Sequence, residues 1–94
     1  MAIGVQQDFE ATLDQYDTVI ARLGLTPGGV SVPGSISHHV VETASGFRVV
    51  DVWESEEAFL AFAQGIIAPI AQELGVAPPT VVMFDVHNYL TTPR

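Results

Sequence analysis

The sequence predicts a single α+β domain in the order β-α-β-β-α-β, with a four-stranded antiparallel sheet and two helices on one of its faces. Two segments repeat apolar residues at spacings of three and four, which is typical of amphipathic helices. Four short segments are rich in β-branched residues and bounded by turn formers, which is typical of strands. The chain has 94 residues, so we expect one domain over residues 1–94.

The first strand is expected at residues 3–7, followed by a helix that Thr12 or Asp14 caps. Gly24 is a suitable helix stop. Residues 25–35 contain two prolines and three glycines and predict a long loop, which either closes over an edge of the sheet or has a function. The apolar stripe of this helix comprises Leu13, Tyr16, Val19, Ile20 and Leu23.

The second and third strands are expected at residues 36–43 and 47–54, and both are rich in valine. Ala44, Ser45 and Gly46 separate them and predict a hairpin turn. Glycine suits such a turn because it adopts a positive φ without strain.

The second helix begins after Ser55, which is a good N-cap and is followed by two glutamates. Pro69 lacks the amide that a helix interior needs, so we expect a kink or break near residues 65–69. The last strand is expected at residues 80–90, with residues 91–94 as a tail. The apolar positions of this helix are Ala58, Phe59, Phe62, Ile66, Ile67, Ile70 and Leu74.

Alternation along the strands sorts their side chains onto two faces of the sheet. We expect the helices to cover the plainer apolar set: Val41, Val50, Val52, Val82, Phe84, Val86 and Leu90. The opposite face then combines aromatic and ionisable residues: His38, Val40, Phe47, Val49, Asp51, Trp53, Met83, Asp85, His87 and Tyr89. Such a face is too apolar for solvent, so we expect it to pack on a second copy and enclose a cavity in a homodimer.

Composition excludes several classes of partner. There are 11 acidic residues, three arginines and no lysine, and a net charge of −8 argues against nucleic acid and anionic membranes. The absence of cysteine excludes disulfides and thiolate chemistry. No apolar run approaches 18 residues and no signal-peptide pattern opens the chain, so we expect an acidic, cytoplasmic protein.

Two stretches carry a family resemblance. RVVDVWESEEAFLAFAQGIIAPI (Arg48 to Ile70) and FDVHNYL (Phe84 to Leu90) resemble the dimeric α+β barrel superfamily, whose members are similar to antibiotic-biosynthesis monooxygenases. The resemblance implies a ferredoxin-like fold whose two sheets pack into a dimeric α+β barrel. It also implies relatives that are cofactor-free monooxygenases of polyketide-type phenols, cyclases, isomerases or haem-degrading enzymes, with Trp53 as a pocket-lining aromatic.

Ionisable residues in the last strand suggest acid–base chemistry. His87 lies on the same predicted face as Asp51 and Asp85, and a His–Asp pair would suit a general base. Tyr89 could then donate a hydrogen bond to a developing enolate or phenolate oxygen. The alternative is a histidine satisfied by a carboxylate in a dimer core. For Asp51 itself, His87, Trp53 Nε1 or a backbone amide are the expected partners.

The same face offers a wall for a flat ligand. The residues expected to line it are Phe47, Val49, Trp53, Met83 and Asp85 together with His38 and Tyr89. Adjacent histidines on a strand point to opposite faces, so His38 and His39 cannot share a metal. A set of His38, His87 and one carboxylate is the remaining metal hypothesis, and we expect neither a metal nor a cofactor.

The leading function hypothesis is a small cofactor-independent enzyme, or enzyme-like binder, of an aromatic or polyketide-type metabolite. Monooxygenase, cyclase and isomerase classes all fit such a cavity. The alternative is a non-catalytic module that binds a small ligand or serves in assembly. A third hypothesis is a haem or metal binder that uses His38 or His87.

Overall fold

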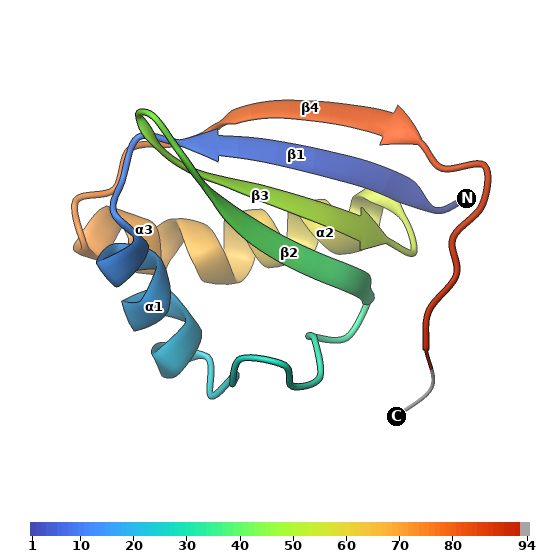
Figure 1. Cartoon of the computed structure of the whole chain (residues 1–94), viewed down its shortest axis with the longest axis horizontal. Coiled ribbons are helices and arrows are strands. Elements are labelled where there is room, and N and C mark those ends of the chain that lie inside the picture. Colours follow the sequence, from blue (N-terminus) through green and yellow to red (C-terminus); the bar gives the residue numbers. More distant parts are fainter. Residues whose placement is uncertain (93–94) are drawn as a thin grey trace.

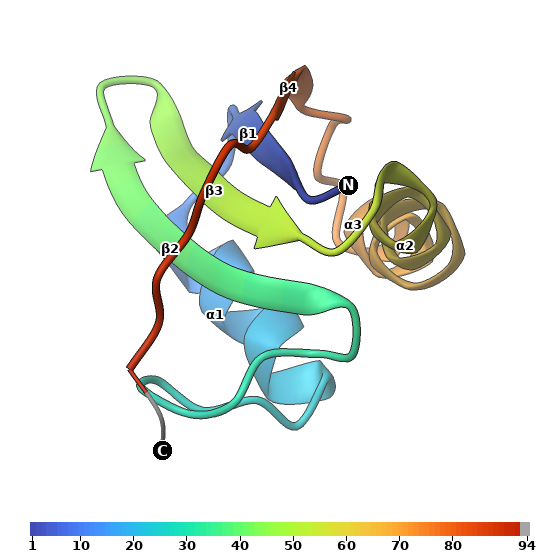
Figure 2. The same cartoon turned by 90° about the vertical axis from the view of Figure 1, so that its right-hand side faces the viewer.

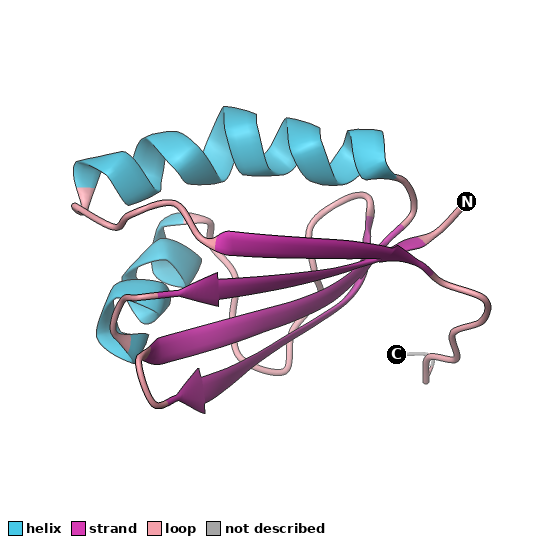
Figure 3. Ribbon diagram, turned by 90° about the horizontal axis from the view of Figure 1, so that it is seen from above, coloured by secondary structure: helices cyan, strands magenta, loops and turns pink. Residues whose placement is uncertain are grey.

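A four-stranded antiparallel sheet with the order β2-β3-β1-β4 carries the helices on one face (Figures 1 and 3). This is the predicted α+β, ferredoxin-like arrangement. The structure is a computed structural model, and it describes residues 1–92. Its elements are β1 (Ile3–Phe9), α1 (Leu13–Arg22), β2 (Ser35–Thr43), β3 (Gly46–Trp53), α2 (Glu56–Phe62), a π turn η1 (Ala63–Ile67), α3 (Ala68–Glu73) and β4 (Thr80–Asp85).

Helix α1 begins at the cap that the sequence indicates. The Thr12 hydroxyl accepts a hydrogen bond from the Gln15 amide, and the Gln15 side chain accepts one from the Thr12 amide. This capping box satisfies two amides that a first helical turn leaves unpaired. Gly24 follows the helix with a φ of +72°, which confirms it as the stop.

The second helix is continuous. Ser55 caps α2 by accepting a hydrogen bond from the Ala58 amide, as predicted. The irregularity expected near residues 65–69 takes the form of the π turn η1, after which Pro69 lies in the first turn of α3. The Ala68 amide bonds to the Ala63 carbonyl, five residues back. This altered hydrogen-bond pattern accommodates a residue without an amide, so no break is needed.

The hairpin between β2 and β3 needs its glycine for a different reason from the one predicted. Gly46 does not have a positive φ. A methyl group there would lie 2.1 Å from the Phe9 carbonyl oxygen and 2.9 Å from the Ala11 nitrogen. Glycine is required because the backbone that joins β1 to α1 passes directly over this position.

The helices cover the opposite face of the sheet from the one predicted. The residues of β3 that are buried beneath them are Phe47, Val49, Asp51 and Trp53. Tyr16 of α1 packs edge-on against Phe47 with ring centroids 5.4 Å apart, and Phe59 of α2 packs against Trp53 at 5.7 Å. Five of the seven residues predicted to be covered lie instead on the open face: Val41, Val50, Val52, Val82 and Phe84. The other two, Val86 and Leu90, follow the end of β4. The alternation of side chains along the strands sorts the residues correctly onto two faces, but it does not indicate which face the helices cover.

Strand β4 ends at Asp85, five residues earlier than predicted. Asp85 pairs with Ile3, where β1 begins. One further backbone hydrogen bond follows the paired residues, from the Val86 amide to the Ala2 carbonyl at 3.1 Å. Beyond this point β1 offers no backbone to pair with. The segment 86–92 therefore leaves the sheet and crosses its end (Figure 2).

The buried core consists of two small clusters on the helix face. One contains Ile3, Val5, Trp53 and Phe59, and the other contains Phe9, Phe47 and Val49. Asp51 lies between them on β3, opposite Val5 of β1, and it is the one buried charged residue in the described part of the chain. None of the helices formed by residues 1–92 combines the length and apolar character that a membrane crossing requires.

Candidate functional site

A cavity of about 910 Å³ lies between the helices and the sheet. Its volume is within the range of small-molecule sites. Side chains of α1, α2, β2 and β3 line it, together with the loop 25–32 and residues 90–92. Its aromatic lining comprises Phe9, Tyr16, Phe47, Trp53, Phe59 and Phe62. The cavity is therefore inside one copy of the chain, whereas the sequence predicted a cavity between two sheets.

Asp51 is the polar centre of this cavity. Its side chain accepts a hydrogen bond from Trp53 Nε1 at 3.1 Å, and its other oxygen lies 2.6 Å from His38 Nδ1. The sheet register sets the second contact, because His38 of β2 lies directly opposite Asp51 of β3. Asp51 is only 4% exposed, and a carboxylate so deeply buried requires such partners. The predicted contact with Trp53 Nε1 is confirmed.

Tyr16 completes a chain of four side chains. Its hydroxyl oxygen lies 2.5 Å from His38 Nε2, and the two rings are nearly parallel with centroids 5.9 Å apart. Burial, with the nearby carboxylates of Asp51 and Asp17, raises the pKa of the Tyr16 phenol to about 12. The hydroxyl therefore keeps its proton near neutral pH. We call Trp53, Asp51, His38 and Tyr16 the relay.

With Asp51 ionised and His38 neutral, only one arrangement of donors and acceptors satisfies the relay. An ionised carboxylate only accepts hydrogen bonds, so His38 must carry a proton on Nδ1 to meet Asp51. In the neutral imidazole Nε2 is then bare and accepts, so the Tyr16 hydroxyl must donate to it. The Tyr16 oxygen is left with its lone pairs as the outer end of the relay.

The structure brings together five of the residues predicted for the site. His38, Phe47, Val49, Asp51 and Trp53 all line the cavity. Met83 and Asp85 share their face of the sheet but lie on the exposed edge strand β4, outside the cavity lining.

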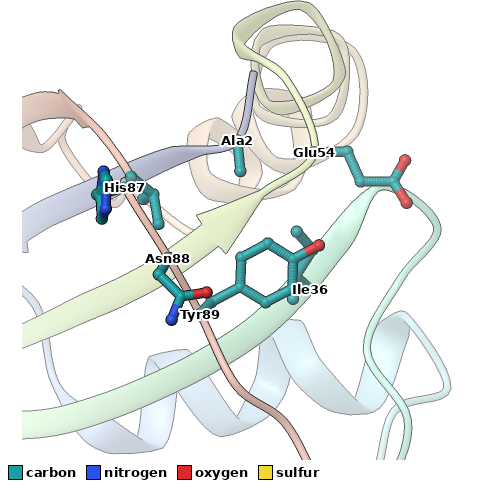
Figure 4. Close-up of a pocket in the computed structure, with 7 residues that line it drawn as sticks. Ala2, Ile36, Glu54, His87, Asn88 and Tyr89 are labelled. Atoms are coloured by element: carbon teal, nitrogen blue, oxygen red, sulfur yellow. The ribbon is translucent and has the colours of Figure 1, made fainter.

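His87 and Tyr89 are placed elsewhere. Both follow β4 and line a separate, shallow pocket of about 580 Å³ at the end of the sheet, beside Glu54 and Ile36 (Figure 4). The prediction that His87 pairs with Asp51 is wrong, because the histidine that meets Asp51 is His38. It failed because residues 86–90 do not continue the strand, so parity does not apply to them.

Tyr16 is the relay residue that the sequence pattern does not reveal as functional, because its spacing places it only in the apolar stripe of the first helix. The available signal was its hydroxyl, since the other members of that stripe, Leu13, Val19, Ile20 and Leu23, have no polar group. A tyrosine in such a stripe needs a partner for its hydroxyl when it is buried.

The relay does not fit a haem or metal ligand role. Both ring nitrogens of His38 already have protein partners, so neither is free to bind iron. His87 lies outside the cavity, and the set of His38, His87 and one carboxylate is not assembled. Within residues 1–92 no group of three or more His, Asp or Glu side chains could hold a metal ion.

Comparisons with known proteins support the fold. No protein-family model matches the chain, and no curated protein does. Among solved structures, a Chloroflexus aurantiacus protein provisionally described as an antibiotic biosynthesis monooxygenase is 24% identical, with a TM-score of 0.61 over 95% of this chain and 97% of that one. SnoaB of Streptomyces nogalater, described as a cofactor-independent oxygenase, is 19% identical, with a TM-score of 0.56 over 97% and 96%.

A third similar structure carries a ligand. It is a MhuD variant with two manganese protoporphyrin IX molecules per active site, 22% identical, with a TM-score of 0.52 over 98% of this chain and 100% of that one. The resemblance to antibiotic-biosynthesis monooxygenases inferred from the sequence is thus confirmed in the fold. Similarity of fold does not by itself transfer chemistry.

Proposed function

We propose that the chain binds a flat aromatic, polyketide-type ligand in the cavity and removes a proton from it without a cofactor. The observation that carries this proposal is the relay, which lies in the wall of an aromatic-lined cavity with His38 hydrogen-bonded at both ring nitrogens. Flat aromatic ligands match such walls by stacking and edge contacts.

The proposed step is a concerted proton transfer. The ligand gives the proton of a hydroxyl or an acidic C–H bond to the Tyr16 oxygen, while the proton of Tyr16 moves to His38 Nε2. The electron pair of the broken bond stays on the ligand as a phenolate or enolate. The resulting imidazolium keeps its 2.6 Å contact with the Asp51 carboxylate, which stabilises its charge.

This step is common to cyclisation, isomerisation and oxygenation by dioxygen, so it does not select among them. SnoaB, with the same fold, is described as a cofactor-independent oxygenase, and this supports chemistry in which the ligand itself supplies the electrons. The support is an analogy of fold, and the relay is the specific argument.

Anthrone, an enolisable tricyclic ketone, is a suitable probe. The test follows exchange of its acidic C–H protons in deuterated buffer by NMR, with the wild type and with His38→Ala. Loss of a general base typically lowers the rate 10²- to 10⁴-fold, and we expect a reduction of about 100-fold or more. His87→Ala is the matched control and should exchange at the wild-type rate.

Three outcomes separate the hypotheses. If His38→Ala exchanges the anthrone protons at the wild-type rate and His87→Ala exchanges them slowly, His87 is the base and His38 is not. Binding of anthrone without accelerated exchange would favour the alternative of a non-catalytic ligand-binding module. If anthrone neither binds nor exchanges, the proposal of an aromatic, enolisable ligand fails.

We further propose that the open sheet face forms the interface of a homodimer. Val41, Val82 and Phe84 are each about half exposed there, and Val50 and Val52 extend the apolar patch across β3. A patch of this kind is costly to leave in water. Light scattering should give twice the chain mass of 10.1 kDa, and Phe84→Glu should give monomers. A wild-type monomer at micromolar concentration would refute the dimer.

A further inference from the structure

We infer that the ligand enters the cavity as a neutral molecule that donates a hydrogen bond to the Tyr16 oxygen, and that anionic analogues are excluded. This inference rests on the proposed function, because it concerns the ligand of the same cavity. It follows from two independent features, which are the direction of the hydrogen bonds along the relay and the charges of the side chains that line the cavity.

The relay presents an acceptor to the ligand. In a neutral His38 the Asp51 carboxylate holds the ring proton on Nδ1, and Nε2 then accepts a 2.5 Å hydrogen bond from the Tyr16 hydroxyl. With its own hydrogen engaged, the Tyr16 oxygen offers lone pairs only. A ligand hydroxyl complements this oxygen, whereas an ether, phenolate or carboxylate brings a second acceptor to it.

No lysine or arginine among residues 1–92 lines the cavity, so neither type balances a ligand anion there. The ionisable side chains of the described lining are His38 and His39, together with Asp17 and Asp51 as well as Tyr16. The arginines of the described chain bind carboxylates elsewhere: Arg22 meets Glu73 at 2.6 Å, and Arg48 meets Asp8 at 2.7 Å on the open face.

An anion would therefore lose hydration without meeting a lysine or arginine side chain of residues 1–92. A charge moved from water into such an environment is strongly disfavoured unless it is paired. The net charge of −8 adds a long-range repulsion of the same sign. A neutral phenol meets neither obstacle, and it becomes an anion only after its proton has reached the relay, where the imidazolium then balances it.

Three naphthalenes of the same ring size test this inference by isothermal titration calorimetry at pH 7: 2-naphthol, 2-methoxynaphthalene and 2-naphthoate. The hydroxyl of 2-naphthol supplies one hydrogen bond that the ether lacks. Such a bond contributes about 1 kcal/mol, so we expect 2-naphthol to bind about five-fold more tightly than 2-methoxynaphthalene. We expect 2-naphthoate to bind at least about ten-fold more weakly than 2-naphthol, because its charge is unpaired.

Tyr16→Phe removes the acceptor, so it should abolish the preference for 2-naphthol over 2-methoxynaphthalene. Tyr89→Phe, outside the cavity, is the matched control and should keep the preference. Equal binding of the three probes, tighter binding of 2-naphthoate, or an unchanged preference in Tyr16→Phe would each overturn the inference while leaving the cavity proposal intact. Failure of all three probes to bind the wild type would instead count against the proposed function itself.

Discussion

Replacing Asp51 with alanine should destabilise the fold by about 2 kcal/mol. The Nε1–H of Trp53, a residue 2% exposed, would lose its acceptor, and an unsatisfied buried donor costs about 1–3 kcal/mol. The His38 side chain is 32% exposed, so water can replace the lost contact at its Nδ1 for less than about 1 kcal/mol. The removal of a buried charge offsets part of this loss.

Thermal unfolding followed by circular dichroism measures the effect. For a domain of this size, about 2 kcal/mol corresponds to a decrease in Tm of roughly 10 °C. Asp85→Ala is the control, because Asp85 is exposed on β4 and its loss should change stability by less than about 0.5 kcal/mol. An unchanged or higher Tm in Asp51→Ala would show instead that the buried carboxylate is a net cost to the fold.

Two further predictions concern backbone crowding and ionisation. Gly46→Ala should lower stability by about 3 kcal/mol in a urea melt, because its methyl group would meet the Phe9 carbonyl oxygen at 2.1 Å, whereas Gly65→Ala, with nothing within 4 Å, should be neutral or stabilising. In Tyr89→Phe the ultraviolet ionisation of Tyr16 should have a midpoint near its raised pKa of about 12. Because the folded pKa of Tyr16 exceeds its ordinary value of 10.0, the associated stability is complete below pH 10 and is lost as pH rises toward 12. A midpoint near 10 would show that the Tyr16 hydroxyl is not held in its half-buried place beside Asp51.

The fold was largely predictable because its signals are local. Thr12 and Ser55 cap their helices as their sequence context indicates, and the strand order follows from the β-α-β-β-α-β succession. The side of the sheet that the helices cover was not predictable from alternation, because both sets of residues on β3 are rich in apolar side chains.

The candidate site was predictable in most of its residues and in the contact of Asp51 with Trp53, but not in the contacts of His38. Alternation alone placed His38, Asp51 and Trp53 on one face, and the register of β2 against β3 turned that grouping into contacts. Tyr16 comes from a helix, and its approach to His38 depends on how α1 packs against the sheet. His87 was misplaced because the end of β4 depends on where β1 begins, which is a property of two distant segments.

The role of Asp51 can also be tested without disrupting its neighbours. In Asp51→Asn the amide oxygen can still accept from Trp53 Nε1, but the amide nitrogen would donate to His38 Nδ1. The ring proton then moves to Nε2, which would donate to Tyr16 and could no longer receive a proton from it.

The most direct test of the relay is therefore the tautomer of His38, read from ¹⁵N–¹H correlation spectra of the imidazole ring near neutral pH. We expect a proton on Nδ1 and a bare Nε2 in the wild type, and the reverse in Asp51→Asn. A neutral wild-type His38 with its proton on Nε2 would rule out the proposed relay, because Tyr16 would then accept the hydrogen bond and could not pass a proton to His38.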